Sequence, residues 1–198
     1  MASIRLISGV EETERLLDAL AEQLLGRKAR YHLVVVGGSA LLALGLVNRP
    51  TRDVDLVAFA RGTELLAPRP LPAALVAGRA VVARDFGLPD DWLNDEPASL
   101  LDFGLPFGFM DRAVRRDYGP ALSVSFASRF DQIHLKLYAT VDQGPGKHEQ
   151  DLRALEPTRD ELVAAARWTR THDPSEGYLG VLVRVLAAFG VEDADLGA

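Results

Sequence analysis

The sequence predicts an α/β protein with a small mixed β-sheet, flanking helices and a C-terminal helical bundle. Three patterns lead to this prediction: the valine-rich run His32–Val36 stops at two glycines, Asp53–Phe59 alternates in polarity, and helical spacing dominates after Ser128. A short apolar run and a period of two are both typical of strands, whereas a period near 3.6 indicates helices. We expect a core over residues 1–127 and a helical region over 128–198 packed on it, an arrangement compatible with a single domain.

The composition excludes several classes of protein. Apolar residues make up 48% and charged residues 25% of the 198 residues, as in ordinary globular proteins. The absence of cysteine excludes disulfides, thiolate metal sites and a cysteine nucleophile. No signal peptide and no run of about 18 apolar residues is found, so we expect a soluble, cytoplasmic protein without a membrane partner. The net charge of −6 argues against broad polyanion binding but leaves room for a local basic groove.

The first elements follow from hydrophobic spacing and from glycine. Leucines recur at helical spacing within Glu11–Leu25, which predicts an amphipathic helix. His32–Val36 is predicted to be a buried strand. We expect Ser39 to be the N-cap of a short helix over Ala40–Leu46, with Gly45 near its end.

The segment that follows is a connector and a second strand. Proline removes a backbone donor and biases the preceding residue toward extended geometry, so Arg49–Arg52 is expected to be a connector. Asp53–Phe59 is predicted to be a strand with Asp53, Asp55 and Val57 on one face. The remaining expected elements are a helix over 70–83, loops and short helices over 85–117, a strand over 121–127, and helices over 128–141, 147–155, 158–170 and 175–189.

The paired aspartates and the glycine turn are the candidate chemical site. Side chains two apart on a strand leave the same face, and two close carboxylates repel unless a cation lies between them. Oxygen ligands suit Mg²⁺ or Mn²⁺, and a nucleoside triphosphate would supply further ligands. Gly37 and Gly38 would let the backbone approach a triphosphate, and Ser39 would add a hydroxyl. Each motif alone fits a plain turn or a solvated strand face; their order along the chain is far more specific.

That order resembles the DNA polymerase β-like nucleotidyltransferase superfamily, in which Gly-Ser is followed by a helix and then Asp-x-Asp. The sequence is most similar to AbiEii/MenT-type toxins and their uncharacterised relatives, over roughly residues 30–165. The matching blocks are Gly37–Leu56, Asp91–Asp95, Leu135–Ala139 and Asp151–Leu155. The resemblance implies the polymerase β-like fold, with residues 1–127 as the nucleotidyltransferase core.

The same resemblance implies further site residues. Lys136 and Asp151 occupy the positions of an active-site lysine and aspartate, with Lys136 also binding the triphosphate. By its own spacing, Lys136 lies on a polar helix stripe and would be a solvated lysine, and Asp151 would be a carboxylate near the start of a helix. Arg49 is a candidate for bidentate phosphate binding, with an ordinary surface arginine as the alternative, and Arg52 is a weaker candidate.

Two further features concern regulation and metal ligation. In some MenT-like systems, the resemblance implies, a cognate antitoxin phosphorylates a hydroxyl near the active site, and Thr51 is the candidate here. Polymerase β-like enzymes usually carry a third carboxylate on a later strand, but the strand over 121–127 offers only serines. The candidates to replace it are Asp95, Asp117 and Asp151.

Together these features predict a metal-dependent transfer of a nucleotidyl group from a triphosphate to an acceptor hydroxyl, with release of pyrophosphate. By resemblance the acceptor is a tRNA 3′ end and the protein a toxin with a possible antitoxin partner. The alternatives are nucleotidylation of a small molecule or protein, and a catalytically silent binding module. Trp92 is expected either to stack on a base or to pack internally. The candidate basic surface for RNA comprises Arg112, Arg115, Arg116, Lys147 and Arg153.

Overall fold

The computed structural model describes residues 5–192 and Leu196. The chain divides into two compact units, Met1–Ala127 and Ser128–Ala198. This boundary coincides with the one expected from the sequence; that the helical region packs on the core as part of a single domain stays a prediction. Within the part of the chain that is described, no helix has both the length and the apolar character needed to cross a bilayer.

The first unit is built on a mixed sheet, which confirms the predicted α/β class. The strand order is β3-β2-β1-β6-β5, and β4 pairs with the beginning of β2. The β1–β6 and β2–β4 pairs are parallel, and the other pairs are antiparallel. The strands are β1 (Tyr31–Val36), β2 (Val54–Arg61), β3 (Glu64–Leu66), β4 (Leu93–Asn94), β5 (Val114–Tyr118) and β6 (Leu122–Phe126).

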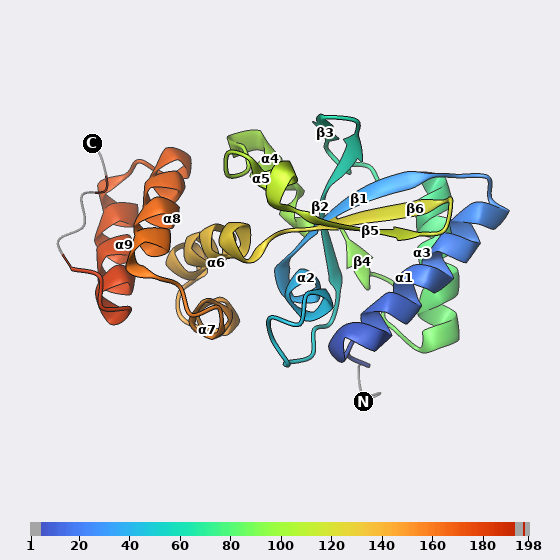
Figure 1. Cartoon of the computed structure of the whole chain (residues 1–198), viewed down its shortest axis with the longest axis horizontal. Helices are drawn as coiled ribbons and strands as arrows, with labels where there is room; N and C mark the ends of the chain where they lie inside the picture. The colour runs from blue at the N-terminus through green and yellow to red at the C-terminus, as the bar shows by residue number, and fades with distance from the viewer. Residues whose placement is uncertain (1–4, 193–195, 197–198) are drawn as a thin grey trace. The chain divides into compact units, whose positions relative to one another are not determined.

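Helices cover the sheet of the first unit. They are α1 (Gly9–Gly26), α2 (Gly37–Ala43), α3 (Ala73–Phe86), the 3₁₀ helix η1 (Glu96–Ser99), α4 (Leu100–Phe103) and α5 (Phe109–Arg112). Helices α1 and α3 pack against each other and against one face of the sheet (Figure 1). The core there includes Leu20 of α1, Leu33 of β1 and Leu56 of β2, each fully buried. Because side chains alternate along a strand, Asp55 lies on the opposite face from Leu56.

Strand β2 is less regular than its sequence suggests. It begins at Val54, so Asp53 immediately precedes the strand and does not belong to it. Val34 pairs with Ala58 but Val35 pairs with Leu56, which leaves Val57 as one extra residue on β2. A bulge of this kind breaks the alternation and increases the local twist. The predicted alternation therefore fails beyond Leu56, and Val57 and Ala58 are both fully buried.

Helix α2 starts earlier than expected, and the prediction of Ser39 as its N-cap is wrong. The helix begins at Gly37, directly after β1, and Ser39 is fully buried in its first turn. Gly37 has φ of 73°, a left-handed conformation that turns the chain from strand to helix. Gly45 ends the helix as predicted: its N–H bonds the Leu42 carbonyl at 2.9 Å, and the next N–H reaches Leu41 at 2.9 Å.

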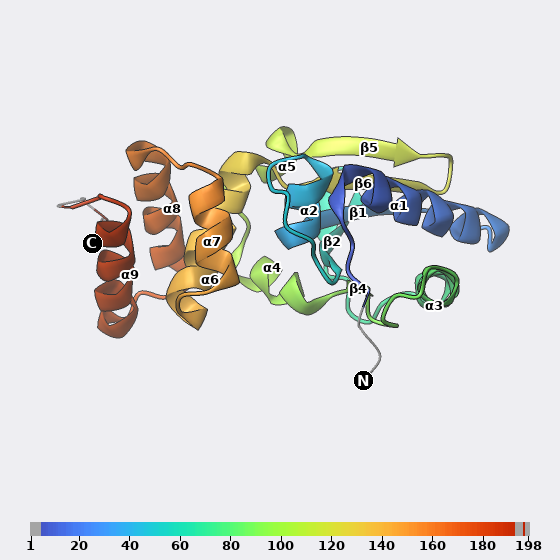
Figure 2. The same cartoon turned by 90° about the horizontal axis from the view of Figure 1, so that it is seen from below.

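The second unit consists of helices α6 (Arg129–Gln143), α7 (Lys147–Ala154), α8 (Arg159–His172) and α9 (Glu176–Ala188). All four were expected from the sequence. The predicted cap is confirmed, because the Ser128 hydroxyl accepts the Asp131 N–H at 3.2 Å. Helices α8 and α9 lie side by side within this unit (Figure 2).

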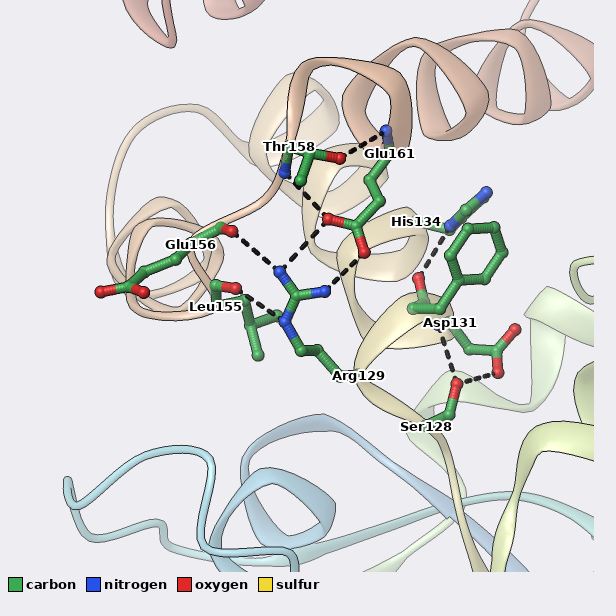
Figure 3. A network of polar contacts seen from close by, with 9 residues as sticks. Ser128, Arg129, Asp131, His134, Leu155, Glu156, Thr158 and Glu161 are labelled. Carbon is green, nitrogen blue, oxygen red and sulfur yellow. Dashed lines mark hydrogen bonds and ion pairs between the residues drawn. The ribbon is translucent and has the colours of Figure 1, made fainter.

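A single arginine ties the α7–α8 connection to α6. The Arg129 guanidinium donates to the Leu155 carbonyl at 2.9 Å and the Glu156 carbonyl at 2.8 Å, and it pairs with the Glu161 carboxylate (Figure 3). Glu161 also closes a capping box with Thr158 at the start of α8. Burial raises the pKa of Glu161, but the hydrogen bonds from Arg129 and Thr158 outweigh burial and hold that pKa below its usual value.

Candidate functional site

The glycine turn seats the carboxylate of Asp55. Asp55 pairs with Val36, the last residue of β1, so its side chain comes to lie over the following residue, Gly37. A Cβ added to Gly37 would stand 2.2 Å from the Asp55 Oδ2 atom. Any other residue here would strain the backbone at φ of 73° and would force the Asp55 carboxylate to move. Gly37 makes room for a carboxylate of the same chain, while its predicted contact with a triphosphate stays a prediction.

The next glycine accommodates the connector in the same way. A Cβ on Gly38 would lie 2.8 Å from the Thr51 hydroxyl oxygen and 3.5 Å from the Arg49 Nη2 atom. The Thr51 hydroxyl donates to Asp53 Oδ1 at 3.5 Å, a long contact. The connector thus lies over the glycine turn, and the structure brings Gly37, Gly38, Arg49, Thr51, Asp53 and Asp55 into one cluster.

Two predicted site residues, Thr51 in this cluster and Ser39 in α2, are buried. Thr51 is 7% exposed, and its N–H and carbonyl both pair with Ile7, at 3.0 and 2.7 Å. Its hydroxyl lies beside Gly38 and Asp53, so a kinase would reach that hydroxyl only after the connector moves. The Ser39 hydroxyl is turned toward the Val36 carbonyl, 3.5 Å away, and away from solvent.

Asn94 is a site residue that the sequence analysis did not single out. Strand β4 places it opposite Asp55, and its Nδ2 donates to Asp55 Oδ1 at 3.4 Å. Its Oδ1 accepts the Glu96 N–H at 2.9 Å. The only signal in the sequence was its position in the block Asp91–Asp95, which indicated a resemblance without a role.

The same block contains Trp92, which packs internally. Trp92 is fully buried, its indole N–H donates to the Arg79 carbonyl at 3.1 Å, and its own carbonyl accepts the Val54 N–H at 2.6 Å. The alternative in which Trp92 stacks on a base is therefore wrong. Its role is to hold β4 between β2 and α3.

Two candidates for the third carboxylate, Asp117 and Asp95, form hydrogen bonds or ion pairs with residues outside the cluster. Asp117 accepts the Ser123 hydroxyl at 2.6 Å and pairs with Arg115, and these two donors lower its pKa. Ser123 pairs with His32, four residues before Val36, so Asp117 lies more than about 13 Å along the sheet from Asp55.

Asp95 forms an ion pair with Arg69 at 3.2 Å. Across residues 5–192, no group of three or more histidine, cysteine or acidic side chains is arranged to hold a metal ion. Among the described residues, the predicted metal ligands beside the glycine turn are therefore Asp53 and Asp55, and the candidate third carboxylates Asp95 and Asp117 pair with arginines instead.

The other two predicted catalytic residues form a buried ion pair in the second unit. Lys136 Nζ, from α6, lies 2.7 Å from Asp151 Oδ2, from α7, and their side chains are 5% and 1% exposed. The interpretation of Lys136 as a solvated lysine is therefore wrong, and the polar stripe that includes Gln132 and Thr140 is buried with it. That this pair acts together with Asp53 and Asp55 stays a prediction.

Most of the candidate RNA-binding arginines have acidic partners in the chain. Arg115 pairs with Asp117, Arg116 with Glu14, and Arg153 with Glu149. Likewise, Arg52 beside the site forms an exposed ion pair with Asp91 at 3.0 Å. These ion pairs reduce the positive charge available to a polyanion.

The donor set fits a small, hard cation. Carboxylate oxygens are typical ligands of Mg²⁺ and Mn²⁺, and Mg²⁺ commonly uses one or two carboxylates with water and substrate phosphates. Asp53 and Asp55 match this pattern. The carboxylate of Asp55 occupies the space that Gly37, which has no Cβ, leaves free.

The mixed sheet, with paired aspartates behind a glycine turn, defines a nucleotidyltransferase-like α/β protein. A family model described as nucleotidyltransferase of unknown function (DUF6036) matches residues 14–145, and the chain belongs to this family. The predicted class of enzyme is confirmed at that level. Neither the curated proteins nor the solved structures contain a match to this chain.

Proposed function

We propose that this protein is a metal-dependent nucleotidyltransferase that transfers a nucleotidyl group from a nucleoside triphosphate to an acceptor hydroxyl, with release of pyrophosphate. The observation that carries the proposal is the pair Asp53 and Asp55, with Asp55 seated over Gly37. The family membership supports the same reaction class. Mg²⁺ or Mn²⁺ bound by these carboxylates would neutralise phosphate charge and activate the attacking hydroxyl.

The neighbouring residues have proposed roles in holding the triphosphate. Arg49 presents a guanidinium beside Gly38, and a planar fork of donors matches a phosphate group. We assign Lys136 to the triphosphate as well, with Asp151 holding its ammonium group; the 2.7 Å ion pair supports the second assignment. Backbone amides at the Gly37–Gly38 turn would add neutral donors.

We propose a tRNA 3′ end as the acceptor, and hence the role of a toxin in a toxin–antitoxin system. This assignment follows the sequence resemblance of the blocks Gly37–Leu56 and Leu135–Ala139. An antitoxin could act through Thr51, because a phosphate there would add nearly two negative charges beside Asp53. The Thr51 hydroxyl lies so close to Gly38 that even a Cβ there would be only 2.8 Å from it. A phosphate on Thr51 would therefore also displace the connector.

A specific observation favours a second acceptor class, a small molecule or a protein. Arg115, Arg116 and Arg153 are each paired with an acid, and the chain carries a net charge of −6. An RNA acceptor would require a surface that releases counterions, and binding would then weaken steeply with salt. Transfer that is insensitive to salt would favour the second class.

The test is incubation of the protein with Mg²⁺, each α-labelled nucleoside triphosphate in turn, and total tRNA. Label that appears in tRNA supports the first proposal, and label in protein or small molecules supports the second. Absence of label from every acceptor, together with absence of triphosphate binding, would contradict the proposal that the protein is an enzyme. The remaining alternative would then be a catalytically silent binding module of the same fold.

A further inference from the structure

We propose that Asn94 is a positioning residue that fixes the metal-binding carboxylate of Asp55. This inference rests on the proposed metal site, and it adds a residue to which no role has been assigned.

The backbone of β4 is anchored from two sides. On one side it pairs with β2, where Asp55 and Asn94 are direct partners. On the other side it is bound to α3 by two reciprocal hydrogen bonds. The Trp92 indole donates to the Arg79 carbonyl at 3.1 Å, and the Arg79 guanidinium donates to the Leu93 carbonyl at 2.8 Å. These contacts hold the two residues of β4 on both sides, and they fix the position from which the Asn94 side chain extends.

The Asn94 side chain has one orientation that satisfies both of its neighbours. The Glu96 N–H needs an acceptor and lies 2.9 Å from Oδ1, while the Asp55 carboxylate needs a donor and lies 3.4 Å from Nδ2. A flipped amide would place two donors together and two acceptors together. Asn94 is 7% exposed, so water does not readily replace either contact.

The two oxygens of Asp55 have different surroundings. Oδ1 faces the Asn94 amide, and Oδ2 occupies the space beside Gly37 that a Cβ would fill. The hydrogen bond from Asn94 restricts rotation of the carboxylate. A ligand that is already oriented loses less conformational freedom when it binds a cation.

The chemistry of the amide explains why asparagine suits this position. An acid here would place a third negative charge against Asp55, with Asp53 already close in sequence, and like charges repel. An aliphatic side chain would leave the Glu96 N–H without its acceptor. Asparagine supplies a neutral donor to the carboxylate and an acceptor to the backbone.

The test is a titration of the full-length protein with MnCl₂, followed by electron paramagnetic resonance of free Mn²⁺. We expect Asn94→Ala to raise the Mn²⁺ dissociation constant about 3- to 10-fold, with one site per chain retained. A merely structural loss would instead reduce the number of sites and leave the dissociation constant of the remaining protein unchanged. If Asn94→Ala is unstable, Asn94→Ser, whose hydroxyl is too short to reach Asp55, serves with the same expectation.

The matched control is Ser123→Ala, which removes a hydrogen bond of 2.6 Å to another carboxylate, Asp117, on the same sheet. Its Mn²⁺ affinity should equal that of the wild type. Binding that is lost in Asp53→Asn but unchanged in both Asn94 variants would overturn this inference and leave the proposed function intact. A wild-type protein that binds no Mn²⁺ would overturn this inference as well, whereas the transfer assay with triphosphate present tests the proposed function separately.

Discussion

Lys136 and Asp151 form an ion pair with 2.7 Å between Nζ and Oδ2, and both side chains are almost completely buried. A buried pair of this kind is costly to break, because removal of one partner leaves a charge without its counterion. It therefore has a structural effect that must be separated from the proposed effect on triphosphate binding.

Single and double substitutions of this pair separate the two effects. We expect Lys136→Met or Asp151→Leu alone to lower the free energy of unfolding by about 3–5 kcal/mol, and the double variant to recover most of that loss. Urea unfolding of the three variants measures this. The double variant should fold but remain inactive in nucleotidyl transfer; wild-type activity in it would assign the pair a purely structural role.

Gly37→Ala tests the seating of Asp55. The new Cβ would collide with Asp55 Oδ2, whereas Gly45→Ala carries similar backbone strain, with φ of 67°, and meets open space. Both variants should lose roughly 1–2 kcal/mol of unfolding free energy from the left-handed conformation. Only Gly37→Ala should lower kcat/KM for transfer, by about 100-fold. A carboxylate displaced by about 1 Å would shift the metal that it binds and so misalign the reacting groups. Equal activities of the two variants would count against the seated carboxylate.

Arg49 and Arg52 provide a matched pair of neighbouring arginines. Arg49 lies beside Gly38, while Arg52 is engaged in an exposed ion pair with Asp91. We expect Arg49→Ala to raise KM for the triphosphate about 10-fold or more, since it removes charge-assisted hydrogen bonds. Arg52→Ala should change KM less than about twofold and stability by less than about 1 kcal/mol. Steady-state kinetics at saturating acceptor measure the two KM values. A larger increase of KM in Arg52→Ala than in Arg49→Ala would assign the phosphate contact to Arg52.

Glu161 gives the second unit a defined dependence on pH. Its pKa in the folded state is depressed below the ordinary value of 4.5, so its stabilising contribution is present above that pH and disappears as the pH falls through the folded pKa. Wild-type protein should therefore lose more unfolding free energy than Glu161→Gln when the pH is lowered from about 6 to about 3. Urea unfolding at the two pH values measures the difference; identical losses would exclude the Arg129–Glu161 contact as a source of acid sensitivity.

Local patterns predicted the long helices and three of the six strands that the structure describes, namely β1, β2 and β6; they did not predict β3, β4 or β5. Apolar spacing located α1 and the four helices of the second unit, and the valine run located β1. The cap at Ser128 was predictable because its partner, Asp131, is only three residues away. The start of α2 was missed because a glycine in a left-handed conformation made the turn that a serine cap was expected to make.

The features that depend on distant contacts were not predictable from the sequence. The register that pairs Asp55 with Asn94 joins residues 39 apart, and Asn94 by itself resembles any loop asparagine. The bulge at Val57 depends on how β1 and β2 align, because one sequence is compatible with several registers. Helical spacing alone places Lys136 in solvent, because spacing shows which residues share a face and does not show what covers that face.

The proposed metal site is tested by transfer of label from α-labelled nucleoside triphosphate to an acceptor by the wild type and by Asp53→Asn, with Asp18→Asn as the control. Asp18 lies on the exposed side of α1, so its substitution removes one carboxylate without touching the site. We expect Mg²⁺-dependent transfer by the wild type and Asp18→Asn, and at least about a thousandfold less by Asp53→Asn, since a lost metal ligand removes several kcal/mol of transition-state stabilisation. Transfer by Asp53→Asn at the wild-type rate would show that Asp53 is not a metal ligand in the reaction.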